Sequence, residues 1–241
     1  MPHLDIVLPV YNEAHVLAGS VERLRAFLQQ TGFPYSWRIV IADNASTDDT
    51  LAVAWQLEDR FEDVAALHIP QKGRGRAQRQ AWLESEGDAM CYMDVDLSTD
   101  LSALLPLARA VLEEGYDVAY GSRMTRGSQI TRSLRREITS RGLILLIKLL
   151  FLSKLSDTQC GFKAIARQAA QELVPRIENQ EWFFDTELLL LAEKGEYRVK
   201  EIPVRWVEDP DSRVDVLKTV AEDLRGLLRM RFRRIPRRGE P

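Results

Sequence analysis

Short apolar runs alternate with longer amphipathic stretches through the first half of the chain. Runs with the length of a buried strand occupy residues 4–10, 37–42, 64–69, 89–93 and 117–121. Between them, apolar residues recur with helical spacing in residues 16–28, 51–60, 76–83 and 101–114. Strands that alternate with helices predict an α/β fold, with a Rossmann-like, mostly parallel twisted sheet and helices on both faces.

The second half of the chain has a less regular pattern. Residues 133–154 predict one long helix, basic at its start and then apolar for about 13 residues, or roughly 20 Å. Because a membrane span needs about 20 residues, this helix is expected to be buried or to lie in a membrane interface. Residues 197–207 alternate as a strand does, and Pro203 suggests a position at a sheet edge.

A helical stripe of apolar residues follows at 217–228 and runs into a basic segment. We therefore expect two parts in this chain. Residues 1–208 would form the α/β domain, and residues 209–241 a basic amphipathic helix and tail. Such a helix could associate with a membrane surface.

A polar cluster follows each of the five predicted strands of the first half. The clusters are Tyr11-Asn12-Glu13, Asp43-Asn44, Lys72 to Arg76, Asp94-Val95-Asp96 and Ser122-Arg123. In an open parallel sheet, the carboxyl ends of the strands meet at one edge, and ligands bind there. The five clusters therefore predict a single binding edge.

Asp94 and Asp96 directly follow an apolar run. On a strand, residues i and i+2 point the same way, so the two carboxylates are expected side by side where the strand leaves the sheet. Converging carboxylates are costly to bury unless a cation lies between them. Mg2+ or Mn2+, shared with a substrate phosphate, fits this pattern. A bare Asp-x-Asp also occurs in turns and helix caps, but the common edge of the five clusters favours a metal site.

The charge of the chain is unevenly distributed. Its net value is −3, so the molecule as a whole is not expected to bind nucleic acid. Residues 123–148 nevertheless hold six arginines and one lysine against a single acid, and residues 225–238 hold seven arginines and no acid. Local basic blocks of this kind favour phosphates or an anionic membrane surface.

The cysteines and histidines do not form a metal-binding pattern. Cys91 and Cys160 are the only cysteines, and the three histidines lie far apart, so no zinc site is predicted. Two isolated thiols suit buried, reduced cysteines in a cytoplasmic protein. Residues 1–5 show no charged region before an apolar core, so no signal peptide is expected.

The order of the polar motifs resembles that of a known enzyme family. Leu8 to Glu13, Asp43 to Asp48 and Asp94 to Asp96 resemble, in this order, family 2 glycosyltransferases of the GT-A fold. Later segments are similar to the polyprenyl-phosphate branch of that family, namely residues 121–123, 157–163, 184–187 and 201–206. Within this branch, the motif Asp-Thr-Gln-Cys-Gly-Phe-Lys at residues 157–163 is more similar to the dolichyl-phosphate β-glucosyltransferases. The resemblance covers about residues 4–232.

This resemblance implies a metal-dependent, inverting transfer of a hexose from a nucleotide sugar to a polyprenyl phosphate. Glucose from UDP-glucose is the preferred donor, with GDP-mannose next, and the cofactor would be Mg2+ or Mn2+. The enzyme would be cytoplasmic and peripheral at the inner face of the membrane. Ser98 stands where the mannose synthases usually carry Gln, so a third metal contact there is not implied.

Candidate site residues follow from the strand ends together with the resemblance. The donor would bind at a nucleotide pocket and at basic groups, namely Pro9, Tyr11, Glu13, Asp43, Lys72, Arg76 and Asp94. The metal would bind at Asp94 and Asp96. The acceptor phosphate would bind at arginines, whose planar fork suits phosphate, namely Arg123, Arg135 and Arg136. The catalytic set would be Asp94, Asp96, Arg123 and Asp185.

The mechanism depends on the acceptor. A polyprenyl phosphate is ionised near neutral pH, so its oxygen could attack the sugar C1 without a general base. A hydroxyl acceptor would need a base, for which Asp157, Asp185 and Glu187 are candidates. Two alternatives stay open: transfer to a soluble hydroxyl with the apolar helix merely buried, and a degenerate domain that only binds nucleotide sugar.

Overall fold

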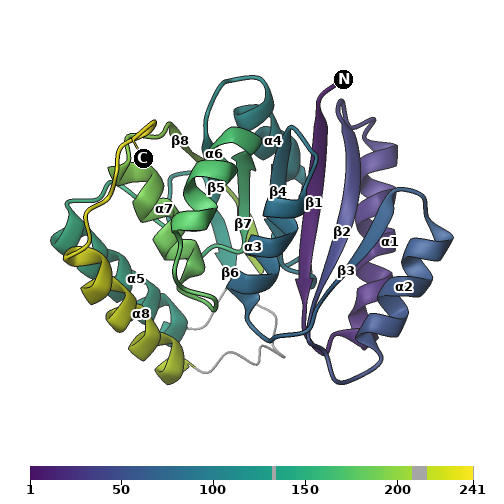
Figure 1. Cartoon of the computed structure of the whole chain (residues 1–241), viewed down its shortest axis with the longest axis horizontal. Helices are drawn as coiled ribbons and strands as arrows, with labels where there is room; N and C mark the ends of the chain where they lie inside the picture. Colours follow the sequence, from purple (N-terminus) through teal and green to yellow (C-terminus); the bar gives the residue numbers. More distant parts are fainter. Residues whose placement is uncertain (132–133, 208–215, 241) are drawn as a thin grey trace.

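The computed structural model describes residues 1–131, 134–207 and 216–240, and the side chains of residues 134–136 and 216–218 lie outside this description. A seven-stranded sheet with the order β3-β2-β1-β4-β7-β5-β8 forms the centre of the molecule (Figure 1). Its strands are β1 (His3–Val10), β2 (Ser36–Asn44), β3 (Val64–Ile69), β4 (Ala89–Met93), β5 (Val118–Ser122), β7 (Phe162–Ala166) and β8 (Val199–Pro203).

Strand β7 runs against its two neighbours, β4 and β5, whereas all other pairs in the sheet are parallel. Strands β1 to β5 therefore share one direction, which confirms that the five polar clusters lie at one edge. The reversed strand begins at the edge where the others end. Residues 157–161, which precede β7, are thereby brought to the same edge, although the sequence pattern does not predict it.

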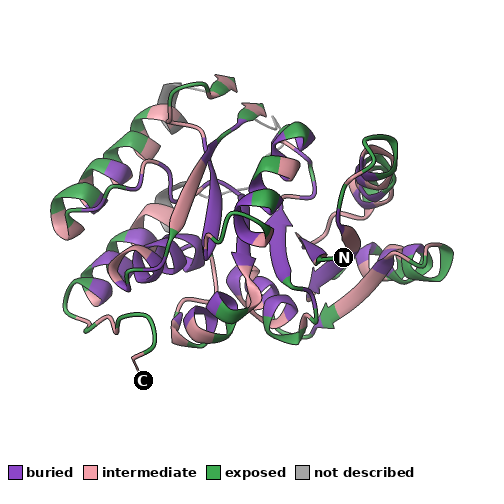
Figure 2. Cartoon of the chain, turned by 90° about the horizontal axis from the view of Figure 1, so that it is seen from above, coloured by how far each residue is buried: buried purple, intermediate pink, exposed green. Residues whose placement is uncertain are grey.

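Helices cover both faces of the sheet, as predicted. Neighbouring residues of β1 alternate between two apolar cores, with Ile6 and Leu8 in one and Val7 in the other. The first core includes α1 (Ala14–Gln30), α2 (Thr50–Arg60) and α4 (Leu104–Leu112). The second includes α3 (Arg74–Glu84), α5 (Leu134–Phe151), α6 (Arg167–Leu173), α7 (Phe184–Lys194) and α8 (Val216–Arg231). Figure 2 shows the strands buried between these layers.

Most predicted elements of the first half are confirmed within a few residues, because their apolar spacing matches their burial. In α1, for example, the buried residues are Leu17, Val21, Leu24 and Leu28. Two short 3-10 helices, Leu101–Ala103 and Val174–Arg176, complete the helical elements of the described chain. Helix α6 was not anticipated from the sequence.

The predicted strand at residues 197–207 is two strands in the structure. Strand β8 lies at the edge of the main sheet, as Pro203 indicated. After Pro203 the chain leaves this sheet, and β9 (Arg205–Val207) pairs in parallel with β6 (Gln129–Thr131). The alternation of apolar and polar residues does not reveal this change of partner strand, because both strands keep a period of two.

Helix α5 is buried on one side only. Ile144 and Ile147 face the second core, whereas Ile138, Leu145 and Leu149 are exposed. The expected burial of this helix therefore holds for one side only, and a place in a membrane interface stays a prediction. Among the described residues, no helix combines the length and apolar character that a membrane crossing requires.

Helix α8 lies beside α5 and packs onto the second core (Figure 1). Its buried residues include Leu227, Met230 and the carboxylic acid Asp223. The side chain of Gln159 donates a hydrogen bond of 2.8 Å to Asp223 Oδ2, while Oδ1 has no hydrogen-bond partner among the described residues. Burial, and then the charge of neighbouring Glu222, raise the pKa of Asp223 to about 7, against the opposing effect of the Gln159 hydrogen bond.

The raised pKa of Asp223 predicts a pH-dependent stability. A carboxyl whose pKa is higher in the folded than in the unfolded chain contributes stability below the unfolded value, near pH 4, and loses it as the pH rises through about 7. Asp223→Asn keeps the shape but does not titrate. Its free energy of unfolding relative to the wild type should therefore rise by roughly 2 kcal/mol between about pH 5 and pH 8. Urea unfolding at both pH values measures this, and parallel pH profiles would contradict it.

Candidate active site

The loops after β1 and β2 are tied together by hydrogen bonds. Asn12 has a positive φ of 57°, and its backbone N–H donates to Ser46 Oγ at 3.0 Å. Its side-chain oxygen accepts from the backbone N–H of Thr47 at 2.8 Å. The backbone N–H of Glu13 donates to Thr50 Oγ1 at 2.8 Å. The half-buried side chain of Tyr11 is therefore held on a fixed loop.

Asp43 is fully buried, and both of its carboxylate oxygens have a polar partner. Its Oδ2 lies 2.8 Å from His68 Nδ1, and its Oδ1 accepts from the backbone N–H of Ser46 at 3.3 Å. Asp43 therefore braces the loop that leads into helix α2, where Asp48 Oδ1 accepts from the first backbone N–H of the helix, that of Thr50, at 3.0 Å. On the adjacent strand β1, Pro9 is only partly buried and pairs in register with Ala42, the residue before Asp43.

The basic loop after β3 joins this group. The backbone N–H of Gly73 donates to Asn44 Oδ1 at 2.6 Å, and Lys72 Nζ lies 3.7 Å above the Tyr11 ring centre. Arg76 folds back and donates to the carbonyl of Lys72 at 2.8 Å. The predicted donor residues of three loops are thus brought together, as their shared edge requires.

Helix α3 begins at Arg74, so most of the polar cluster from Lys72 to Arg76 is helical. Two glycines allow this helix to approach the chain before α7. A Cβ on Gly73, whose φ is 154°, would lie 2.7 Å from the carbonyl oxygen of Gln180. A Cβ on Gly75 would lie 2.6 Å from Cβ of Phe184. Larger residues would therefore push the two segments apart.

Asp94 and Asp96 do not alternate along a strand, which corrects the local prediction. Strand β4 ends at Met93, and the carbonyl of Asp94 accepts from the backbone N–H of Leu97 at 3.1 Å, which closes a turn. Asp96 is exposed, and its Oδ1 accepts from the backbone N–H of Ser98 at 2.9 Å. A turn, instead of a pleated strand, brings the two carboxylates to the edge of the sheet.

Arg74 is the fixed cation beside Asp94. Its guanidinium pairs with Asp94 Oδ1 and lies 3.0 Å from Asp185 Oδ2. It also lies 4.7 Å from the ring centre of Trp182 and 5.1 Å from that of Tyr92. Burial would lower the pKa of Arg74, but the charges of Asp94 and Asp185 and the hydrogen bond to Asp94 outweigh it and raise the pKa.

Asp185 lies between two cations. Lys163 is fully buried, and its Nζ lies 3.3 Å from Asp185 Oδ1 and donates to the carbonyl of Cys160 at 2.6 Å. The buried Tyr92 hydroxyl lies 3.4 Å from the same ammonium. Because burial, and then the charge of Asp185, raise the pKa of Tyr92 well above its usual value, this phenol stays neutral. Asp185 does not act as a helix cap, since no side-chain hydrogen bond caps α7.

Arg123 binds Asp157 through two parallel hydrogen bonds. Its Nε and Nη2 donate to the carboxylate at 2.7 and 3.0 Å, and its backbone N–H donates at 3.0 Å. Burial by itself would raise the pKa of Asp157, but the Arg123 guanidinium holds that pKa below its usual value. Asp157 is therefore a counter-ion for Arg123 and is poorly suited to act as a base. Arg135 and Arg136 lie outside the described side chains.

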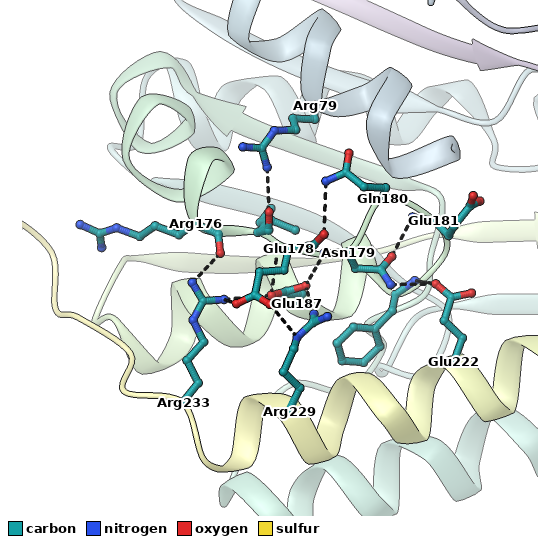
Figure 3. Close-up of polar contacts among 12 residues, drawn as sticks. Arg79, Arg176, Glu178, Asn179, Gln180, Glu181, Glu187, Glu222, Arg229 and Arg233 are labelled. Atoms are coloured by element: carbon teal, nitrogen blue, oxygen red, sulfur yellow. Dashed lines mark hydrogen bonds and ion pairs between the residues drawn. The ribbon is translucent and has the colours of Figure 1, made fainter. Parts of the chain in front are cut away.

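Glu187 is also paired with arginines and is not accessible as a base. It is fully buried, and it accepts from Arg229 at 2.6 Å and from Arg233 at 3.1 Å (Figure 3). The backbone N–H groups of Glu178 and Asn179 complete its partners at 3.2 and 3.0 Å. Four donors around one buried carboxylate indicate a structural role.

The residues at the edge fit a hard divalent cation as part of a larger coordination shell. Within residues 1–131, 134–207 and 216–240, no group of three or more His, Cys, Asp or Glu side chains could hold a metal by itself. Asp94 and Asp96 supply carboxylate oxygens, which Mg2+ and Mn2+ prefer, and substrate phosphates commonly supply the rest. A Cβ on Gly161 would overlap Asp94 Oδ2, so Gly161 leaves the space that this carboxylate occupies.

Sequence reasoning missed several residues of the site. Arg74 falls within the predicted cluster from Lys72 to Arg76 without a role of its own, and the sequence assigns no role to Lys163, Trp182 or Gly161. A lysine inside the apolar run Phe-Lys-Ala-Ile-Ala is a usable signal, because a buried strand rarely carries an unpaired charge. Nothing in the sequence shows its partner, since 22 positions separate Lys163 from Asp185.

Comparisons with known proteins agree with this arrangement. A family model described as glycosyl transferase family 2 matches residues 5–174. Glycosyltransferase AglD of Haloferax volcanii is 34% identical over 222 residues, which cover 90% of this chain and 35% of the relative. A dolichyl-phosphate β-glucosyltransferase of Drosophila melanogaster is 30% identical over 224 residues, which cover 88% of this chain and 69% of that protein.

The fold is shared with solved glycosyltransferases. Glucosyl-3-phosphoglycerate synthase from Mycobacterium tuberculosis, in complex with UDP, superimposes with a TM-score of 0.70 at 18% identity, covering 95% of this chain and 80% of that one. The architecture is the GT-A fold, as the resemblance implied. Together with the match of the family model over most of the chain, these findings show that the protein belongs to glycosyltransferase family 2.

Proposed function

We propose that this glycosyltransferase moves a hexose from a nucleotide sugar to a polyprenyl phosphate with inversion at C1. The observation that carries the proposal is the convergence of Asp94, Arg74 and Arg123 at one sheet edge, close to helices with an exposed apolar face. It is also supported by the names of relatives such as the Drosophila dolichyl-phosphate β-glucosyltransferase. UDP-glucose is the preferred donor, with GDP-mannose next.

The donor would bind across the loops that follow β1, β2 and β3. Pro9, Tyr11, Glu13 and Asp43 would form or brace the nucleotide pocket. The basic groups that follow β3 would neutralise the diphosphate, namely Lys72, Arg74 and Arg76. All of these loops are joined by hydrogen bonds or ring contacts, which supports one preorganised pocket.

Asp94 and Asp96 would hold Mg2+ or Mn2+. When bound, such an ion stabilises the negative charge of the departing nucleoside diphosphate. The M. tuberculosis synthase has been crystallised with Mn2+ and UDP-glucose, which supports a divalent cation in this fold. Arg74 would orient Asp94, and Asp185 would hold Arg74 in place.

The acceptor phosphate would bind at Arg123. Among the residues that the structure describes, Asp157 accepts from two of the five N–H groups of this guanidinium, which leaves three for a phosphate. Trp206 packs 5.2 Å from the guanidinium and restricts its position. An ionised phosphate needs no general base, which agrees with the engagement of Asp157 and Glu187 by arginines. Arg135 and Arg136 remain predicted partners of the same phosphate.

We also propose that the basic helix and tail at residues 209–241 help to hold the enzyme at an anionic membrane surface. The exposed large apolar residues are Ile138, Leu145 and Leu149 of α5, with Leu152 just beyond that helix, and Leu224 and Leu228 of α8, with Phe232 just beyond. Arg225, Arg231 and Arg234 are exposed among them. An apolar face flanked by cations is the usual composition of a peripheral membrane site.

One assay tests the proposed reaction. Full-length enzyme with Mn2+, a panel of nucleotide sugars and a short polyprenyl phosphate should give a glycosylated lipid that mass spectrometry detects. Asp94→Asn should lower kcat/KM by roughly a hundredfold or more, because it removes one charge from the metal site. Transfer only to soluble hydroxyl acceptors would favour the first alternative. Metal-dependent binding of a nucleotide sugar without any transfer would favour a degenerate binding domain.

Gly161→Ala tests the proposed metal site without substituting either of the proposed metal ligands. The added methyl group would displace Asp94, so the affinity for Mn2+ in the presence of UDP should fall by about tenfold or more. Electron paramagnetic resonance of free Mn2+ measures this directly. Gly19→Ala on α1 is the matched control, because a Cβ there meets nothing within 4 Å. Equal affinities in the two variants would contradict the assignment of Asp94.

The membrane proposal predicts a loss of vesicle binding when the apolar face is made polar. Leu149→Ser, Leu228→Ser and Phe232→Ser together should weaken binding to phosphatidylcholine vesicles with about a third phosphatidylglycerol by about tenfold or more. Trp55→Ser on α2 is the control, because Trp55 is an exposed large apolar residue at 51% on a different helix. Sedimentation measures the bound fraction. Equal binding of the triple variant and the wild type would overturn the proposal.

A further inference from the structure

Helix α8 carries charged residues on the side that faces the enzyme. Arg229 and Arg233 bind the buried carboxylate of Glu187, and both also lie within ion-pair distance of Glu178, at 3.4 and 3.0 Å (Figure 3). Two turns before Arg229, Glu222 accepts from the side chain of Asn179 at 2.9 Å. These contacts all fall on residues 178–187, the segment that enters and begins α7.

The approach of α8 to this segment is very close. A Cβ built on Gly226 would overlap the ring of Phe183, which is fully buried. Gly226 therefore lets the helix axis come near enough for the arginines to reach Glu187. Charge pairing and steric fit thus hold the same segment by independent means.

The other side of residues 178–187 touches α3. The backbone N–H of Arg76 donates to the carbonyl of Gln180 at 3.0 Å, and a Cβ on Gly75 would lie 2.6 Å from Cβ of Phe184. Just before the segment, the carbonyls of Val174 and Ile177 accept from Arg79 at 2.8 and 2.7 Å. The segment is therefore clamped between α8 and the helix that starts with the basic loop (Figure 3).

Two side chains of the clamped segment reach the candidate metal site. Trp182 stacks on the Arg74 guanidinium, and Asp185 accepts from it at 3.0 Å. Arg74 in turn pairs with Asp94. An unbroken series of contacts therefore runs from α8, through residues 178–187, to the first aspartate of the metal motif.

We propose that Glu187, Arg229 and Arg233 are positioning residues for the donor site. By fixing residues 178–187 on α8, they hold Trp182 and Asp185 so that Arg74 is oriented on Asp94 before the donor arrives. None of the three touches the proposed metal ligands. The proposal rests on the proposed function only for the identity of the donor, and it links a helix with an exposed apolar face to the donor edge.

Removing the two positive charges is the first test. Arg229→Gln with Arg233→Gln should raise the KM for the nucleotide sugar by about tenfold, a usual size for coupling between sites, and change kcat much less. The donor would then have to order a segment that is already ordered in the wild type. Arg229→Lys with Arg233→Lys keeps the charges and should recover most of the affinity. Loss of kcat alone, with an unchanged or lower donor KM, would overturn the proposal.

A steric variant tests the same coupling without changing any charge. Gly226→Ala should force α8 away from Phe183 and reproduce the rise in donor KM. Gly142→Ala on α5 is the matched control, because a Cβ there meets nothing within 4 Å and the substitution leaves donor KM unchanged. If Gly226→Ala behaves like Gly142→Ala, α8 does not position the donor site.

Amide hydrogen exchange gives a readout that does not depend on activity. In both the double glutamine variant and Gly226→Ala, exchange of residues 178–187 and of the first turn of α3 should rise, while exchange of β1 and β2 stays unchanged. A general increase across the sheet would indicate simple destabilisation and would contradict positioning. If the wild type binds no nucleotide sugar by calorimetry, the proposed function fails, and this exchange pattern alone decides the coupling.

Discussion

Buried charge has to be paired, and the site of this protein is organised by that constraint. Asp157, Lys163, Asp185 and Glu187 are all nearly or fully inaccessible to solvent. An isolated charge in such surroundings costs several kcal/mol, so each of these groups requires an opposite charge at close range. The partners come from α3, β7, the loop after β5 and α8. The ion pairs therefore determine how these separate elements meet at one edge of the sheet.

The reversed strand β7 makes this pairing possible. Because it runs against β4 and β5, its first residues lie where the parallel strands end. Lys163 then faces Asp185, and Gly161 leaves space for Asp94. A parallel strand at the same place would bring its other end to this edge. The loop that holds Asp157 near Arg123 enters by the same route.

The result is an edge that carries two fixed cations, Arg74 and Arg123, together with the partly exposed Asp94 and the exposed Asp96. Arg74 and Arg123 are held by buried acids, so neither has to be reorganised when negative charge arrives or develops. Preorganised charge of this kind is the main way in which enzymes stabilise a departing diphosphate. The arrangement suits a family 2 glycosyltransferase, in which the leaving group and the proposed acceptor both carry phosphate.

The sequence by itself determined the alternation of strands and helices, the shared edge of five polar clusters and the family of the enzyme. These features depend on local apolar spacing and on short motifs, such as Asp94-Val95-Asp96, that can be read without distant contacts. Only the tertiary structure decided that Arg74 pairs with Asp94, that Glu187 binds α8 and that residues 197–207 divide between two sheets. Such pairings join residues far apart in the chain, and the apolar period of a segment carries no information about the partner of its charged residues.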